Sequence, residues 1–147
     1  MPKGNRRQRP RLIWPDIEIG DWSGEFAGSP SGSIGQNVQP GPPLTTIEFT
    51  YLIVGASVVS PVSKFRWPAI VAFWVPTILK PPCNDVGSMF KSHDLPSLNL
   101  SFEITRNQYS DICWLFREKL LKDFHFSVLP QSDSQWPLKG WGASFEL

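Results

Sequence analysis

Two cysteines and two histidines are the residues whose types could build a metal site. They stand 10, 20 and 12 positions apart along the chain, as Cys83, His93, Cys113 and His125. Zinc sites are usually built from closely spaced ligand pairs such as CxxC, and none of these four residues forms one. Cys113 falls on the apolar side of a predicted helix, where a buried thiol is ordinary. The spacing predicts no metal and no cofactor.

Motifs for nucleophilic or acid–base catalysis are also missing. Cys83 and His93 share a predicted loop but lack the flanking residues of a cysteine nucleophile. Residues 55–59 (GASVV) lack the second glycine of a GxSxG turn, and there is no Walker A or GxGxxG sequence. Glu103 and Glu146 lie on the polar sides of predicted strands, where acidic residues ordinarily face water. We predict that the protein is not an enzyme.

Tryptophan is the residue type that points most directly to binding, and the chain has 7. Trp136 lies in a predicted polar loop, where an exposed indole can anchor a partner. Trp141 alternates with residues that are predicted to be buried, which indicates a core position. Because aromatic faces also stack on sugar rings, an aromatic-rich ligand- or carbohydrate-binding module is the alternative function.

Length and charge narrow the class of protein. The chain has 147 residues, 14 Lys plus Arg and 13 Asp plus Glu, giving a net charge of +1. One domain fits this length, and a dedicated nucleic-acid binder would carry a clearer basic excess. Within the most apolar stretch, residues 65–80, the span from Trp67 to Leu79 has 13 residues, fewer than the roughly 20 that a membrane-spanning helix needs. The basic start leads into Trp14-Pro15-Asp16 rather than an apolar run, so we expect a cytoplasmic protein without a membrane span.

Residues 1–43 differ in composition from the remainder. They hold 7 Pro, 7 Gly and 4 Ser, whereas residues 44–147 hold only 4 Gly. Such a segment buries too little apolar surface to offset its ordering entropy. We therefore predict an extended N-terminal arm over 1–43, ending in a flexible linker over 28–43, and a single globular domain over 44–147.

Large aromatic residues and a basic tip make the arm a candidate binding segment. The tip carries +5 from Lys3 and four arginines, and an acidic stretch with aromatic residues follows it. Aromatic anchors in a disordered segment commonly order on a partner, although docking on the protein's own domain is an alternative. The predicted partner-binding residues are Trp14, Trp22, Phe26, Arg6, Arg7, Arg9, Arg11 and Trp136.

Periodicity predicts the elements of the domain. Apolar alternation predicts strands over 47–54, 69–75, 98–104, 124–129 and 141–147, with a loop over 81–96. Thr105 and Gln108 form a capping-box pattern before an amphipathic helix of about 106–122. We expect an α+β fold, with a mainly antiparallel or mixed sheet of about five strands and one long helix on one face.

No family resemblance is specific enough to name. The combined features favour a small non-catalytic protein that acts by protein–protein interaction, as an accessory, inhibitor or assembly subunit. Its partner is a protein or a second copy of itself, because open sheet edges can pair between copies. Nucleic acid is a less favoured partner.

Overall fold

The structure, a computed structural model, describes residues 17–60, 66–76, 85–92 and 97–147. Within these residues it has seven strands and one helix: β1 (Gly20–Gln39), β2 (Thr45–Ser60), β3 (Trp67–Trp74), β4 (Gly87–Lys91), β5 (Leu98–Glu103), α1 (Arg106–Arg117), β6 (Asp123–Val128) and β7 (Trp136–Ser144).

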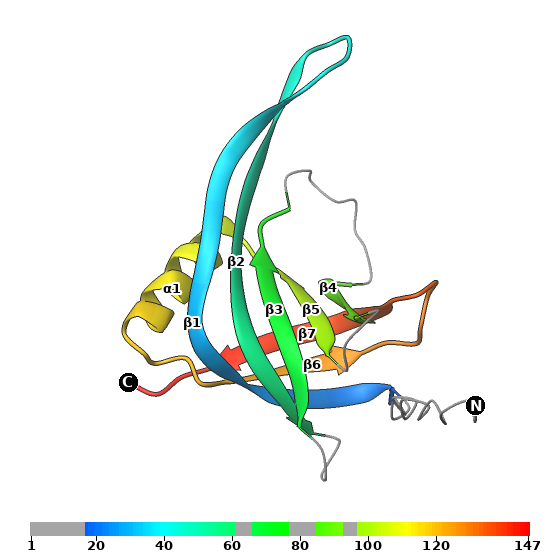
Figure 1. The fold of residues 1–147 in the computed structure, drawn as a ribbon, viewed down its shortest axis with the longest axis vertical. Coiled ribbons are helices and arrows are strands. Elements are labelled where there is room, and N and C mark those ends of the chain that lie inside the picture. The colour runs from blue at the N-terminus through cyan, green and yellow to red at the C-terminus, as the bar shows by residue number, and fades with distance from the viewer. Residues whose placement is uncertain (1–16, 61–65, 77–84, 93–96) are drawn as a thin grey trace, which may run out of the picture.

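The strands form a closed barrel in the order β1-β2-β3-β5-β4-β7-β6 (Figure 1). Pairing of β6 with β1 closes the ring, and β3 with β5 is the one parallel pair among the described strands. The predicted α+β fold, an open sheet of about five strands with a long helix, is therefore wrong. The protein is mostly β, with a single short helix among the described residues.

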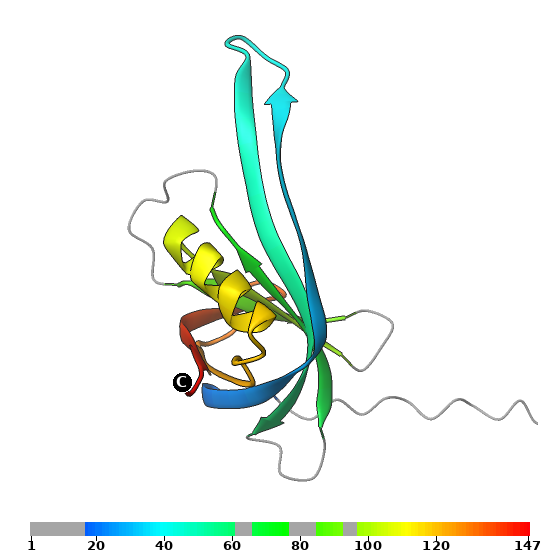
Figure 2. The same cartoon turned by 90° about the vertical axis from the view of Figure 1, so that its left-hand side faces the viewer.

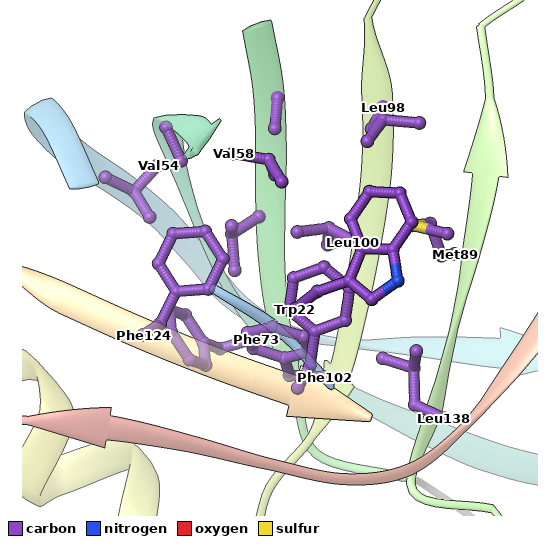
Figure 3. Close-up of a cluster of buried hydrophobic side chains, with 14 of the residues drawn as sticks. Trp22, Val54, Val58, Phe73, Met89, Leu98, Leu100, Phe102, Phe124 and Leu138 are labelled. Carbon is purple, nitrogen blue, oxygen red and sulfur yellow. The ribbon is translucent and has the colours of Figure 1, made fainter. Parts of the chain in front are cut away.

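The alternation of buried with more exposed side chains explains why these segments form a barrel wall. In β5 every second residue is buried, and β3 and β6 show the same period of two. The buried members fill the interior with aromatic rings and aliphatic side chains (Figure 3). Among them Phe102 stacks on Trp141 at 5.2 Å and lies 5.6 Å from Phe73, measured between ring centroids. The barrel is thus closed around a packed aromatic core rather than a channel.

β1 occupies most of the segment that composition predicts to be an arm and linker. Residues 20–25 pair with β6, and residues 23–27 and 31–39 pair with β2, so β1 is part of the barrel sheet. A register shift between Ala27 and Ser31 contains Gly28, whose φ of 77° is readily adopted by glycine. Glycine and proline therefore mark an irregularity in a long strand here, and the boundary predicted after residue 43 falls in the connection between β1 and β2.

Helix α1 begins as the sequence predicts and ends sooner. The capping box is confirmed: the Gln108 amide donates to Thr105 Oγ1, and the Thr105 amide donates to the Gln108 side chain. The helix stops at Arg117, and Lys119 adopts a φ of 57°, so the predicted extent of 106–122 is too long. Ile112 and Leu115 are buried against the barrel, and the Phe116 ring reaches the core aromatics.

The predicted strands are present with different bounds, and β7 spans Trp136–Ser144 rather than 141–147. β2 runs through Gly55 without ending, and the loop predicted over 81–96 contains β4. The strands that flank α1 do not pair with each other, because β5 lies between β3 and β4 whereas β6 lies between β1 and β7. The last two strands, β6 and β7, pair antiparallel with each other.

The β1–β2 hairpin extends well beyond the barrel (Figures 1 and 2). β2 pairs with β3 only from Tyr51 to Val58, and β1 pairs with β6 only from Gly20 to Glu25. The part beyond these pairings, residues 31–50, is called the projecting hairpin below. It is the most prominent feature of the surface.

Candidate partner-binding surface

Trp22 lies in the core and not on the surface. Its side chain is 2% exposed, its ring lies 5.9 Å from that of Phe126, and its Nε1 donates to the Glu18 carbonyl at 2.8 Å. A buried indole with its polar group satisfied stabilises the barrel. The prediction that Trp22 anchors a partner is corrected accordingly, since docking on the protein's own domain is what the structure has.

Phe26 also faces the protein's own interior. Its ring lies 4.8 Å from Phe124, 5.0 Å from Phe116 and 6.0 Å from Phe73, between ring centroids. The side chain therefore joins β1 to α1 and the barrel core. As with Trp22, the aromatic residue of the predicted arm is part of the fold, and the prediction of a partner anchor is corrected.

Trp136 begins β7 and is only partly exposed. Its ring packs against the core, and Lys91 Nζ lies 5.6 Å from the ring centroid, within cation–π range. It is thus placed at the barrel wall rather than free in a loop. The remaining predicted partner-binding residues, Trp14, Arg6, Arg7, Arg9 and Arg11, lie outside the described residues.

The residues considered for chemistry do not converge where they are described. Cys113 is half-buried on α1, whereas His125 is exposed on β6. Within the described ranges no three His, Cys, Asp or Glu side chains gather in a way that could hold a metal ion. Cys83 and His93 lie outside those ranges.

The projecting hairpin has large apolar side chains that are exposed to solvent. Ile34 is 70% exposed, Val38 is 66% exposed, and Leu44 at the turn is 76% exposed. From Phe26 to Ile47 the sequence contains no Asp, Glu, Lys or Arg. Single exposed apolar residues are normal, but an extended uncharged ribbon that carries several of them indicates an interaction site.

Glycine lets the hairpin carry aromatic residues on one face. The Phe49 ring lies so close to Gly35, its cross-strand partner, that a side chain on Gly35 would overlap it. Phe49 in turn lies 6.3 Å from Tyr51 between ring centroids, with the planes 30° apart. The small residue on β1 therefore provides the space for an aromatic pair on β2.

A groove of about 520 Å³ separates the base of the hairpin from the first turn of α1. The ion pair of Arg106 with Glu48 joins its two sides, and both side chains are substantially exposed. Burial raises the pKa of Tyr109 above its ordinary value, and interaction with Cys113 raises it further. Tyr109 is therefore a neutral phenol at physiological pH, in the lining of the groove.

An apolar patch continues from the hairpin over the outside of the barrel. Tyr51 and Ile53 of β2, Ile70 of β3 and Phe90 of β4 are between 37% and 46% exposed. Asn99 of β5 pairs with both Ile70 and Phe90, which places these two side chains on the same face. We call these four residues the outer patch.

Sequence reasoning missed this surface because it assigned residues 28–43 to a linker. The signals that mark it are the absence of charge from Phe26 to Ile47 and the alternation of apolar with polar residues that begins at Ile47.

No protein-family model, curated protein or solved structure matches the chain. In the part of the chain that the structure describes, no helix has the length and apolarity needed to cross a membrane.

Proposed function

We propose that the protein is non-catalytic and acts by protein–protein contact, with the projecting hairpin as its contact surface. The observation that carries this proposal is the exposure of Ile34 and Val38 on a ribbon without charged residues over 26–47. Burying such side chains against a protein partner removes apolar area from water at no cost in charge desolvation. An accessory, inhibitor or assembly subunit would use a contact of this kind, and a cytoplasmic location stays a prediction.

The absence of charge favours protein over nucleic acid at this surface. Neutralisation of phosphates by Lys and Arg supplies most non-specific affinity for nucleic acid, and the hairpin has neither residue over 31–50. Its one charged residue, Glu48, is acidic and paired with Arg106. The apolar side chains and the free backbone of a strand are what a protein partner recognises.

Affinity capture from the source cells with the full-length chain tests the proposal. Ile34→Ser combined with Val38→Ser should reduce the captured partner at least about tenfold, while the thermal midpoint changes little, because both side chains are already in water. The matched control is Ile19→Ser, which removes an aliphatic side chain that is 64% exposed outside the hairpin. Equal capture by the wild type and the double variant would refute the proposal.

A small aromatic or sugar ligand in the groove beside α1 is the second candidate. The observation in its favour is that the neutral phenol of Tyr109 lines the groove together with Ile34 and polar groups. Aromatic faces and a few polar groups are the usual components of such sites. Tyr109→Ala should abolish ligand binding measured by calorimetry and leave partner capture unchanged, whereas Val38→Ser, outside the groove lining, should weaken capture and leave ligand binding unchanged.

A further inference from the structure

One backbone edge of the projecting hairpin has no neighbouring strand. β1 pairs with β2 out to Gln39, but its other edge pairs with β6 only as far as Glu25. Among the described residues no backbone hydrogen bond reaches residues 31–39 from any strand but β2. Figure 2 shows this stretch of β1 standing clear of the barrel. An isolated two-stranded ribbon is marginally stable in water, so a third strand would stabilise it.

The register identifies the backbone groups that face this open edge. The Thr50 carbonyl accepts a hydrogen bond from the Val75 amide at 3.0 Å, so the backbone groups of Thr50 point away from β1. Ile34 is the cross-strand partner of Thr50, and the two form a pair without mutual hydrogen bonds. Because hydrogen-bonded and non-hydrogen-bonded pairs alternate along an antiparallel ladder, Ile34, Gln36 and Val38 direct their N–H and C=O groups outward.

This edge also lacks the features that keep edge strands apart. Edge strands are commonly protected by charged side chains, prolines or bulges. Between Ser31 and Gln39 there is no charged residue and no proline, and the irregularity at Gly28 comes before this stretch. An edge of this length without protection is a template for pairing with another strand.

We propose that a second copy of the chain pairs with this edge, antiparallel and with the two-fold axis at Gln36. In that register Ile34 lies opposite Val38 of the partner subunit, and the same pair recurs on the other side of the axis. The two exposed β-branched side chains thereby form cross-strand pairs with each other. The three outward-facing residues of each copy are in phase to exchange hydrogen bonds across the axis.

A second copy suits this edge better than an unrelated strand for two reasons. A two-fold axis places identical side chains near each other, and the uncharged stretch avoids the repulsion that this would otherwise cause. The apolar residues are also spaced symmetrically, two positions on either side of Gln36. This inference rests on the proposed function, since it names the protein that the hairpin contacts.

Sedimentation velocity over a range of concentrations tests the pairing with matched proline variants. Gln36→Pro removes an outward-facing N–H at the axis, and should weaken dimerisation at least about tenfold because two hydrogen bonds are lost per dimer. Thr46→Pro is the control: Thr46 pairs with Val38 across the hairpin, so its N–H faces the opposite edge. This variant should dimerise as the wild type does. Equal weakening by both variants would overturn the proposed edge.

A charge exchange tests the position of the axis even if a proline variant folds poorly. Gln36→Lys alone and Gln36→Glu alone should each be monomeric, because like charges then face each other across the axis. An equimolar mixture of the two should form a heterodimer. Dimers that persist in both single variants would overturn the register.

The outcome for the wild type separates this inference from the proposed function. A wild-type chain that stays monomeric at every concentration, yet loses partner capture on Ile34→Ser with Val38→Ser, overturns self-pairing and leaves the proposed function standing. A concentration-dependent dimer that Gln36→Pro weakens and Thr46→Pro does not supports both.

Discussion

The two halves of strand β1 show how the barrel and the projecting hairpin differ. In the barrel, Trp22 of β1 is 2% exposed and stacks against Phe126. Further along the same strand, Ile34 is 70% exposed. The first half has sheet neighbours on both edges, whereas the second half has β2 alone among the described strands.

This difference assigns stability to one half of the strand and, under the proposed function, recognition to the other half. Burial of aromatic and aliphatic side chains in the barrel stabilises the fold, since hydrophobic stabilisation scales with the apolar area removed from water. The hairpin leaves apolar side chains and backbone groups in water, where they are available to a partner. Substitutions in the barrel should therefore change stability, and substitutions in the hairpin should change binding.

Replacing a buried tryptophan should have the largest effect. Trp22→Ala should lower the free energy of unfolding by about 3–5 kcal/mol, because it removes a packed ring from the core. Trp114→Ala is the matched control, since that side chain on α1 is 52% exposed, and it should cost less than about 1 kcal/mol. Urea denaturation measures both values. Similar losses for the two variants would contradict the placement of Trp22 in the core.

Composition alone could not predict that the first half of β1 belongs to the barrel. The apolar residues Trp22 and Phe26 do indicate that this segment needs a surface to pack on, and docking on the chain itself was one of the predicted alternatives. Local composition cannot show that the surface is β6, because residues 123–128 lie about a hundred positions away. Long-range pairing overrode the weak strand propensity of Gly and Ser.

Alanine substitution at two glycines should cost more stability in the barrel wall than in the projecting hairpin. Gly87 of β4 has a φ of 147° and lies against the Ser101 backbone, so Gly87→Ala should cost at least about 2 kcal/mol. Gly35→Ala in the hairpin meets only the Phe49 side chain, which can rotate, and should cost about 1 kcal/mol or less. Thermal unfolding compares the two variants, and a larger loss of stability for Gly35→Ala would contradict the expected order.

Elements with local signals were predicted well. The capping box at Thr105 and the alternation in residues 98–104 depend only on near neighbours in sequence, and both are confirmed. The last turn predicted for the helix was wrong because Lys119 leaves the helical conformation, after which Leu121 is buried in the core. The proposed contact surface was not predicted, because a charge-free stretch rich in glycine is compatible with a linker as well as with an unprotected strand.

The smallest expected effect is on the ionisation of Tyr109, which lines the groove between the projecting hairpin and α1. In a Tyr51→Phe background, absorbance titration should show that Tyr109 ionises with a pKa above 10, and Cys113→Ala should lower that pKa while burial keeps it raised. Because the raised pKa belongs to the folded state, stability should fall as the pH rises above about 10, where the unfolded chain ionises first. An unchanged pKa in the Cys113 variant would contradict the contribution of that thiol.

Amide hydrogen exchange at the open edge of β1 tests the central claim most directly. The amides of Ile34, Gln36 and Val38 should exchange more slowly as protein concentration rises, because self-pairing gives each an acceptor on the partner subunit. The amides of Thr46 and Glu48, on the opposite edge of the same hairpin, should exchange at rates that do not depend on concentration. Concentration-independent exchange at all five positions would contradict the account.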